Sequence, residues 1–531
     1  MRPATKEELA KSSRVWRPLR IPIFRNLLIA DLVSDMGTFM QNVGAAWLMV
    51  SFGVGPAYVA LTQTASSLPF FLLAPIAGSV GDVVDRRKLV LLTEGWMILV
   101  ALALAVLTIA HVMSPWLLLA LTFALSAGDA FEAPSWRALL PELVRQDDLA
   151  AASALNGIEF NFARAVGPAL AGFVIALAGV AAAFVLNVVS FAGVFGVIAG
   201  WKHQGPSTVA PREHLRGAIV AGFRYVRFSP EIKAVILRQG ASIFFASALL
   251  ALLPSLAHNI SQSAIGYGVL LGVFGGGAVL GAILLQPLRS LWPAEVVFSG
   301  GIAIFGAAMI AMGTLRTLPA LVPILFVAGA AWIAFISLSN ALMQMLTPDW
   351  VRARVLAMFL LVFQGSFAIG SAVWGAIAQR VGVPSTLYWA GFGTIATVGM
   401  AVAFQLPNAV ADLSPGAHWR LPSIRGGVAG IEPGPVLVTV EYAVRPERES
   451  DFKALMDRYR LVRRRNGAAR WELFRDIEAD DRYLEAFLVR SWAEHQRQHE
   501  RQTKADQELE GEIRQCLTDE PKVRHLLDAS A

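Results

Sequence analysis

Very long stretches without a charged residue constrain this chain more than any other feature. No Asp, Glu, Lys or Arg occurs at 36–81, 165–201 or 239–288. A bilayer core about 30 Å thick is crossed by about 20 apolar residues in a helix, so each of these runs fits two crossings. Helices satisfy their own backbone hydrogen bonds in lipid, and the alternating ten-residue pattern of barrel strands is absent. The sequence therefore predicts an all-α polytopic membrane protein.

The apolar part divides into twelve predicted transmembrane helices, in two six-helix repeats. The longest connection between spans, at 201–235, predicts a linker between a bundle at 26–200 and a second bundle at 236–406. The predicted spans are 26–50, 57–80, 89–111, 115–136, 154–178, 180–200, 236–258, 265–288, 294–315, 320–346, 355–379 and 384–406.

The end of the chain has a different composition. Of the 97 residues from Pro435 to Ala531, 38 are charged, against 46 in the preceding 434. A Pro/Gly-rich linker is predicted at 407–434 and a soluble α+β domain at 435–531. Its expected elements are strands at 436–444, 470–478 and 481–490 and helices at 447–464 and 491–517. This order resembles the ferredoxin-like fold of small antibiotic-biosynthesis-type monooxygenases, which often dimerise through their sheets.

Short loops with Lys and Arg indicate the orientation, because such loops stay in the cytoplasm. The loops after odd-numbered spans carry only Arg316 and Arg380, whereas those after even-numbered spans carry many more basic residues. We therefore expect both termini, including a lead at 1–25, to lie in the cytoplasm, and the protein to reside in the inner (plasma) membrane. No signal peptide is recognised, and the single cysteine, Cys516, excludes a disulfide within the chain.

Two pairs of short sequences suggest that the halves are repeats. LPELVR at 140–145 corresponds to TPDWVR at 347–352, and GPALAG at 167–172 corresponds to GSAVWG at 370–375. The offsets of 207 and 203 differ by only four residues, and both pairs occupy equivalent spans. Two halves of like topology are typical of transporters whose halves rock against each other.

The loop between the second and third spans is strongly charged. Its residues Gly78, Asp82, Arg86 and Arg87 match the loop signature of the major facilitator superfamily, whereas Val83 and Asp85 depart from it. The resemblance implies a gate in which Asp82 gains and loses cationic partners, with Arg86 and Arg87 supplying part of that latch. The alternative is that these charges only fix the topology.

The fifth span contains ARAVGPALAG at 163–172, which resembles the efflux motif of the same superfamily. Pro168 removes a backbone donor, and Gly167 and Gly172 allow close helix packing, as expected at a seam between halves. Simple small-residue packing is the alternative. The longer stretch at 129–172 resembles the transmembrane secretion effector branch, which includes the enterobactin exporter. Membership would imply export from the cytoplasm driven by the proton gradient.

Ionisable residues inside spans are expensive and therefore candidates for function. Asp35, Asp129 and Glu132 are the predicted proton-coupling groups, and Arg164 is their predicted counter-charge. The span that holds Asp129 lacks the arginine usual in drug antiporters of this superfamily. The competing interpretation is that acidic groups such as Asp31, Glu94 and Glu132 lie near the cytoplasmic interface in water. We favour it for Asp31 and Glu94.

Amides and aromatic rings in the spans predict a cavity for an amphipathic organic molecule. Lipid-facing or packing roles are the alternative for each of them. The candidates are Gln41, Asn42, Gln63, Asn161, Trp332, Asn340, Gln344, Phe363, Gln364 and Trp389.

The polar tail offers few chemical signals. His495 and His499 are four residues apart, a spacing that suits a metal or haem, but a solvated helix face is the favoured interpretation. Arg463, Arg464 and Arg465 either contact anionic lipid or merely end a helix. We expect no metal, cofactor or nucleic acid, and a regulatory or dimerising role for this domain.

Three functions remain open. The favoured one is a proton-coupled secondary exporter, an antiporter, of small amphiphilic molecules such as a siderophore, drug or secondary metabolite. The second is a membrane-anchored monooxygenase-like enzyme, for which buried carboxylates and repeated halves would be unnecessary. The third is an uptake or lipid carrier of the same fold. No phosphate-binding loop typical of ATP-driven pumps occurs.

Overall fold

The computed structural model of the protein describes residues 16–201, 215–407, 411–416 and 434–527. It contains two compact units, each built from three stretches of the chain. The first, here called the helical unit, consists of residues 1–210, 237–339 and 360–403. The second, here called the tail unit, consists of residues 211–236, 340–359 and 404–531. The tail unit thus includes parts of the chain that the sequence assigned to helical bundles and their loops.

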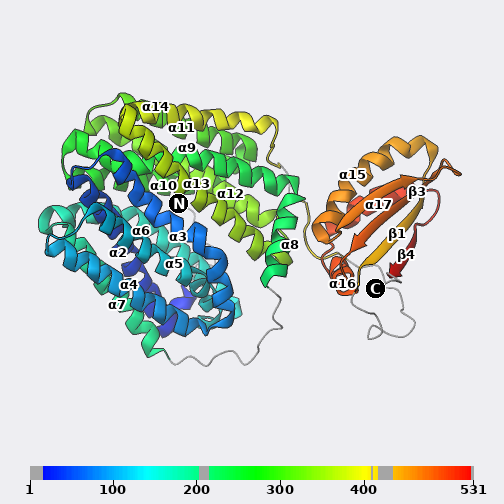
Figure 1. Ribbon diagram of the computed structural model, residues 1–531, viewed down its shortest axis with the longest axis horizontal. Coiled ribbons are helices and arrows are strands. Elements are labelled where there is room, and N and C mark those ends of the chain that lie inside the picture. The colour runs from blue at the N-terminus through cyan, green and yellow to red at the C-terminus, as the bar shows by residue number, and fades with distance from the viewer. Residues whose placement is uncertain (1–15, 202–214, 408–410, 417–433, 528–531) are drawn as a thin grey trace, which may run out of the picture. The chain divides into compact units, whose positions relative to one another are not determined.

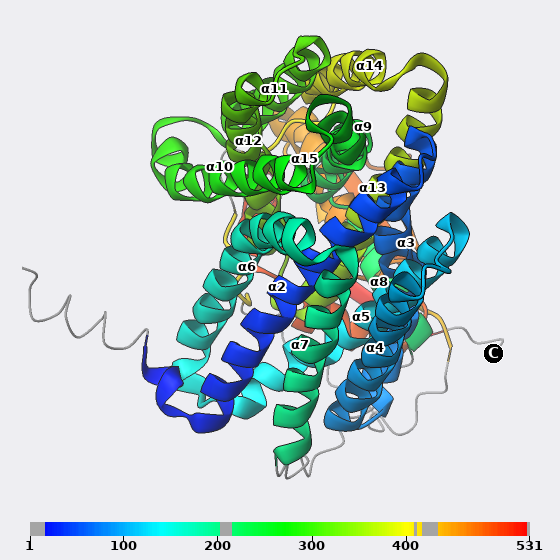
Figure 2. The ribbon, with the colours of Figure 1, turned by 90° about the vertical axis from the view of Figure 1, so that its left-hand side faces the viewer.

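The helices of the first predicted bundle lie together in the views of Figures 1 and 2, as do those of the second. The first group comprises α2 (Pro22–Ser51), α3 (Pro56–Val83), α4 (Arg86–Ile109), α5 (Pro115–Leu143), α6 (Leu149–Ala178) and α7 (Val180–Gly200). The second comprises α9 (Pro230–Ser261), α10 (Ala264–Leu291), α11 (Ala294–Thr314), α12 (Leu318–Met345), α13 (Asp349–Val381) and α14 (Val383–Ala396), which a 3₁₀ helix continues over Thr397–Val402.

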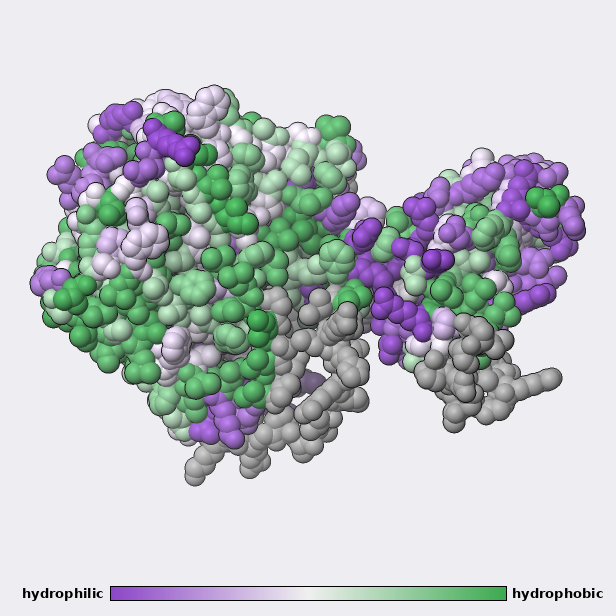
Figure 3. Space-filling view, viewed as in Figure 1, coloured by the Kyte–Doolittle hydropathy of each residue, from purple (hydrophilic) through white to green (hydrophobic). Residues whose placement is uncertain are grey.

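Among the described residues, nine helical segments are long and apolar enough to cross a membrane. The remaining three predicted spans correspond to α2, α3 and α14, so the polytopic all-α class is confirmed while the count of twelve crossings stays a prediction. Figure 3 shows that hydrophobic residues cover most of the visible face of the helical unit. Large apolar side chains of the helical unit such as Leu92, Leu99 and Leu177 are exposed, as lipid contact requires.

A glycine with left-handed backbone geometry follows the corresponding helix in each of the two halves. Gly179, after α6, has φ 79°, and Gly382, after α13, has φ 83°. A side chain would strain this left-handed backbone, so glycine is needed at both turns. The two glycines are 203 residues apart, which is the offset between the GPALAG and GSAVWG sequences. The backbone geometry thus repeats at the spacing that the sequence pairs have.

Small residues line two helix contacts within the helical unit. A Cβ atom on Gly172 of α6 would lie 3.0 Å from the Ala264 carbonyl oxygen and the Gly268 Cα of α10. A Cβ on Gly375 of α13 would lie 2.4 Å from the Ala60 Cβ of α3. Both contacts join a helix of one half to a helix of the other, and both place backbones closer than larger side chains would allow.

The tail unit contains a four-stranded antiparallel sheet of order β2-β3-β1-β4. Its strands are β1 (Val436–Ala443), β2 (Arg470–Arg475), β3 (Arg482–Val489) and β4 (Lys522–Leu527), and its helices include α8 (Leu215–Arg227) and α15 (Glu449–Asn466).

The three predicted strands and the first predicted helix are present, but β4 was not expected. The single helix predicted over 491–517 is wrong: α16 (Trp492–Glu500) and α17 (Lys504–Gln515) are separate, because Thr503 forms a capping box with Asp506 and starts a new helix.

One face of this sheet forms the core of the tail. Alternate residues of β1, from Val436 to Tyr442, are buried against Phe452 and Met456 of α15 and Ile513 of α17. The single cysteine, Cys516, is also buried in this core. The opposite face is more open, with Phe474, Leu484 and Leu526 exposed.

Candidate functional site

A cavity of about 670 Å³ lies within the helical unit, lined by helices of both halves. The helices of the first half contribute six acidic residues to its wall, here called the acid wall. They are Asp31 and Asp35 of α2, Glu94 of α4, Asp129 and Glu132 of α5, and Glu159 of α6. The helices of the second half contribute the aromatic wall, formed by Tyr267, Phe274, Trp332, Phe363 and Phe367. The acidic residues of the lining therefore come from the first half, whereas aromatic residues come from both halves, the first adding Phe39, Phe70, Trp136, Phe160 and Phe191.

The centre of the acid wall is a contact between α4 and α5. The Thr93 hydroxyl donates a hydrogen bond of 2.7 Å to Oε2 of Glu132. The carboxyl groups of Glu94 and Glu132 lie within hydrogen-bonding reach of each other. Two carboxyl groups share a hydrogen bond only when one of them carries a proton, because an ionised carboxylate is solely an acceptor. This arrangement is thus able to hold a proton.

Two carboxyl oxygens of the acid wall lack a hydrogen-bond partner among the described residues. They are Oε2 of Glu94 and Oε1 of Glu159. Glu94 is 2% exposed and Glu159 is 7% exposed. The favoured expectation of a hydrated Glu94 near the membrane surface is therefore wrong. Helix α4 begins at Arg86, where Asp85 caps it, so Glu94 lies about 12 Å along the helix.

Arg164, the predicted counter-charge, lines the same cavity. Its Nη2 atom donates a hydrogen bond of 2.9 Å to Asn161 Oδ1, and its guanidinium lies 5.9 Å from the centre of the Phe160 ring. The described part of the chain contains no ion pair between Arg164 and a carboxylate. Arg164 thus lies beside the acid wall while its hydrogen bond is made within α6.

The predicted cavity residues divide into two groups. Asn42, Trp332 and Gln364 line the cavity, together with Gln63 and Phe363. Gln41 instead accepts a hydrogen bond of 2.6 Å from Asn187 in the interior of the first bundle. Asn161, Asn340, Gln344 and Trp389 are also not lining residues. Periodicity could not separate these groups, because amides suit both a cavity and a buried contact between helices.

The predicted gate is only partly described. The side chains of Gly78 and Asp82 lie outside the described residues, so their predicted role is open. Arg86 forms an ion pair of 2.5 Å with Glu142, near the end of α5. Arg87 donates hydrogen bonds to the carbonyl oxygens of Ile198 and Ala199 at the end of α7. Glu142 was not recognised from the sequence, although it lies in the repeated LPELVR segment.

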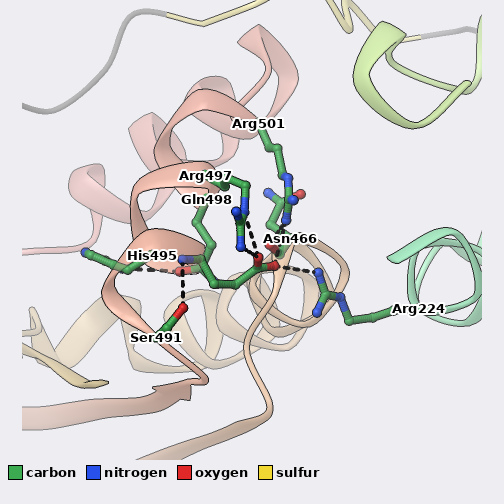
Figure 4. A network of polar contacts seen from close by, with 8 residues as sticks. Arg224, Asn466, Ser491, His495, Arg497, Gln498 and Arg501 are labelled. Carbon is green, nitrogen blue, oxygen red and sulfur yellow. Dashed lines mark hydrogen bonds and ion pairs between the residues drawn. The ribbon is translucent and has the colours of Figure 1, made fainter. Parts of the chain in front are cut away.

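The tail unit contains a dense network around Glu494 of α16 (Figure 4). Its Oε1 atom accepts hydrogen bonds from Arg224 of α8 at 2.9 Å and from Arg501 at 2.8 Å. Its Oε2 atom accepts one from Arg497 at 2.9 Å. Burial opposes ionisation of Glu494, but Arg501, Arg497 and Arg224 together lower its pKa. The network therefore connects α8 to the α+β fold through a fixed carboxylate.

The three consecutive arginines at the end of α15 also form ion pairs or hydrogen bonds within the tail unit. Arg463 forms an ion pair with the buried Glu485, Arg465 one with Asp506, and Arg464 donates to the carbonyl oxygen of Ala469. Contact with lipid head groups stays one of the two alternatives that the sequence left open for these side chains. They hold the helix to the rest of the tail.

His495 is buried, so the expected solvated helix face is wrong at this position. Its Nδ1 atom lies 3.3 Å from Gln498 Oε1, and its Nε2 atom lies 3.2 Å from His499 Nε2. Burial, followed by the neighbouring His499 and His525, lowers the pKa of His495 to about 3. Within the described residues, no group of three or more His, Cys, Asp and Glu side chains has a geometry that would hold a metal ion.

Comparison with known proteins places this arrangement in context. Residues 13–531 match the family described as transmembrane secretion effectors. The enterobactin exporter EntS of Citrobacter koseri is 25% identical over 411 residues, which are 74% of this chain and 96% of that protein. EntS of Escherichia coli strain 536 is 24% identical over 384 residues, which cover 70% and 89% of the two chains.

Solved structures resemble the chain in fold. A bacterial homologue of the lysosomal transporter Spinster, facing inward, gives a TM-score of 0.55 at 15% identity over 72% of this chain and 94% of that one. A bacterial homologue of the iron transporter ferroportin gives 0.55 at 16% identity, covering 72% and 97%. A transporter of the POT family gives 0.58 at 12% identity, covering 72% and 95%.

Proposed function

The chain belongs to the transmembrane secretion effectors of the major facilitator superfamily, and from this premise we propose that it is a proton-coupled exporter of small amphiphilic molecules. The family and its relatives indicate a multi-pass membrane transporter rather than an enzyme. The observation that carries the proposal is the cavity with its acid wall and aromatic wall. The acids exchange protons, and the aromatic side receives the apolar part of the substrate.

Alternating access supplies the route across the membrane. The close contacts of α6 with α10 and of α13 with α3 are the seams along which the halves rock, and Asp82, Arg86 and Arg87 gate one side. Export follows from the resemblance to the enterobactin exporters, whose names describe that activity. The proposed location is the inner membrane, with both termini in the cytoplasm.

Reconstituted vesicles test the coupling. With an imposed proton gradient, the wild-type protein is expected to move its substrate against the substrate's own gradient, acting as an antiporter. Asp129→Asn should abolish this movement while the protein remains inserted and monodisperse. Asp147→Asn, an exposed acidic residue outside the cavity, is the matched control and should transport normally. Proton-driven transport by Asp129→Asn at the wild-type rate would remove Asp129 from the mechanism.

The tail domain is proposed to dimerise through the open face of its sheet. This face carries the exposed Phe474, Leu484 and Leu526, with Leu437 paired to both Leu488 and Leu526 across strands. Apolar residues on an open sheet face favour association with a second copy. Native mass spectrometry of the full-length protein should show dimers that Leu484→Glu converts to monomers, whereas Ile477→Glu, in the β2–β3 turn, should leave them intact.

A further inference from the structure

Helix α8 directly precedes α9, which is long and apolar enough to cross the membrane, and one face of α8 is buried. Ala221 and Tyr225 are buried on this face, and the Tyr225 ring lies 5.6 Å from the Trp350 ring at the start of α13. A Cβ atom on Gly222 would lie only 3.0 Å from the Arg354 Cβ, so the backbone of α8 approaches α13 closely. This face of α8 is therefore fixed to other parts of the tail unit.

The opposite face of α8 is exposed and combines apolar with basic side chains. Val220, Phe223 and Arg227 are exposed there, and Phe223 is 56% exposed. In a helix of 3.6 residues per turn, these three positions lie within about 60° of one another and opposite the buried Ala221 and Tyr225. A helix with Phe and Arg on one exposed face has the composition of helices that lie in a membrane interface.

An exposed face of α9 follows the exposed face of α8. Only two residues separate the helices, because α8 ends at Arg227 and α9 begins at Pro230. Pro230, Lys233 and Leu237 are exposed, and their spacing of three and four residues places them on one side of α9. Leu237 lies within the apolar span, where exposed side chains contact lipid. The exposed residues of α8 are thus followed along the chain by a lipid-contacting surface.

The charges on this surface favour an anionic partner. Arg227 and Lys233 form no ion pair with any residue that the structure describes, and Glu231 is an acidic residue exposed beside them. Arg224, in contrast, points into the network around Glu494 and pairs with that carboxylate (Figure 4). Basic side chains at the end of a span attract anionic head groups, which lie at that depth of the bilayer.

We propose that α8 is an interfacial helix that binds anionic phospholipids of the bilayer. Arg227 and Lys233 bind the lipid phosphates, while Val220 and Phe223 enter the boundary between head groups and acyl chains. Because Arg224 binds the tail, α8 contacts lipid and the α+β fold with different sides. This inference concerns a lipid partner and not a transported substrate, so it goes beyond the proposed exporter function.

Photocrosslinking identifies what covers the exposed face. Phe223 is replaced by the photoreactive p-benzoylphenylalanine in the full-length protein, which is placed in nanodiscs with equal amounts of phosphatidylglycerol and phosphatidylcholine. Mass spectrometry after illumination is expected to find phosphatidylglycerol attached at position 223. Ile477, which is 98% exposed in the β2–β3 turn, is replaced in the same way as the control and should give no lipid adduct. Attachment of another segment of this chain at position 223, or the absence of an adduct, would overturn the proposal.

The ratio of the two lipid adducts measures the preference for negative charge. Phosphatidylglycerol should exceed phosphatidylcholine about tenfold, because each basic residue near the surface contributes about a fivefold preference and Glu231 opposes it. Arg227→Gln and Lys233→Gln, made in the photoreactive protein, should each lower the ratio about fivefold. Arg458→Gln, which changes an exposed arginine of α15, is the matched control and should not alter it. Equal attachment of the two lipids would overturn the proposal.

Ionic strength provides a measurement that needs no further substitution. The excess of phosphatidylglycerol adducts should decrease as salt is added, because salt screens exposed charges. A lipid preference that ignores the salt concentration would contradict a role for Arg227 and Lys233. These readouts do not depend on transport, so they test the lipid partner independently of the exporter function.

Discussion

Buried acids occur in both units of this protein, but their surroundings differ. In the tail, Glu485 is fully buried and is bound by Arg463 at 3.0 Å, by the Trp471 indole at 2.7 Å and by the Tyr442 hydroxyl at 2.8 Å. In the cavity, Glu94 is almost as buried, yet one of its oxygens has no partner among the described residues. Glu485 is thus bound on both oxygens by the tail itself, whereas Glu94 keeps one oxygen without a hydrogen-bond partner in the described part of the chain.

The largest loss of stability is expected when the ion pair between Glu485 and Arg463 is broken. Glu485→Ala leaves the mostly buried Arg463 without its carboxylate, and breaking a buried pair costs about 3–5 kcal/mol. Hydrogen exchange of the β1 and β3 amides in the full-length protein should accelerate accordingly. Glu441→Gln, which removes the partly exposed pair with Arg482, is the control and should change stability by less than about 1 kcal/mol. Similar hydrogen-exchange rates in both variants would show that the buried ion pair of Glu485 stabilises the tail no more than the partly exposed pair of Glu441.

Acidification should weaken the tail through His495. The pKa of His495 is about 3 in the folded tail and near 6.5 in the unfolded chain. Between these pH values the unfolded chain is therefore protonated at His495, whereas the folded tail is not. Stability is unaffected above pH 6.5 and falls below it, by up to about 2 kcal/mol at pH 5. The lowered pKa of Glu494 acts in the same direction at still lower pH.

The measurement is the pH dependence of exchange in β1 and β3. His495→Gln should flatten this dependence, whereas His111→Gln, in a loop of the helical unit, should not. A wild-type tail whose stability is constant between pH 7 and 5 would contradict the prediction.

Glu94→Gln is expected to separate function from stability. It removes a buried acid that has an unpartnered oxygen, so thermal unfolding should be unchanged or shifted upward, while transport should fall about tenfold. Fluorescence-detected unfolding and vesicle transport of the same preparation provide both numbers. A marked loss of stability would show that Glu94, like Glu485, stabilises the fold.

The smallest effect is expected at Arg224. Glu494 keeps Arg497 and Arg501 when Arg224→Gln is made, so we expect a loss of only about 1 kcal/mol, confined to the contact of α8 with the tail. Exchange in α8 should increase about fivefold, while that in β1 stays constant. Arg227→Gln, an exposed neighbour on the same helix, serves as the control. Uniform acceleration throughout the tail would show that Arg224 supports the whole domain.

The sequence predicted what local patterns determine. Uncharged runs predicted helices, because lipid permits few alternatives, and alternation predicted β1, β2 and β3. It did not predict the position of Glu94 within α4, since that depended on the cap at Asp85, four residues before the predicted start of the span. Nor did it predict β4, whose pairing with β1 joins residues more than 80 positions apart.

The candidate site was predicted in its residue types more than in its partners. Asp35, Asp129, Glu132 and Arg164 do line one cavity, which the helical spacing suggested. The tail networks could not be found in this way. A buried His495 and a triply bound Glu494 look like surface residues in a sequence of 38 charges, because Arg224 of α8 and His525 of β4, which contact them, are distant in the sequence.

The lone cysteine has a practical consequence. Cys516 is enclosed in the tail core, so a thiol introduced on any loop would be the single accessible one in the folded protein. Membrane-impermeant maleimides applied to intact cells would then report which loops face outward, without first engineering a cysteine-free background. The crossing number and the side on which the tail resides can be mapped directly on the native sequence.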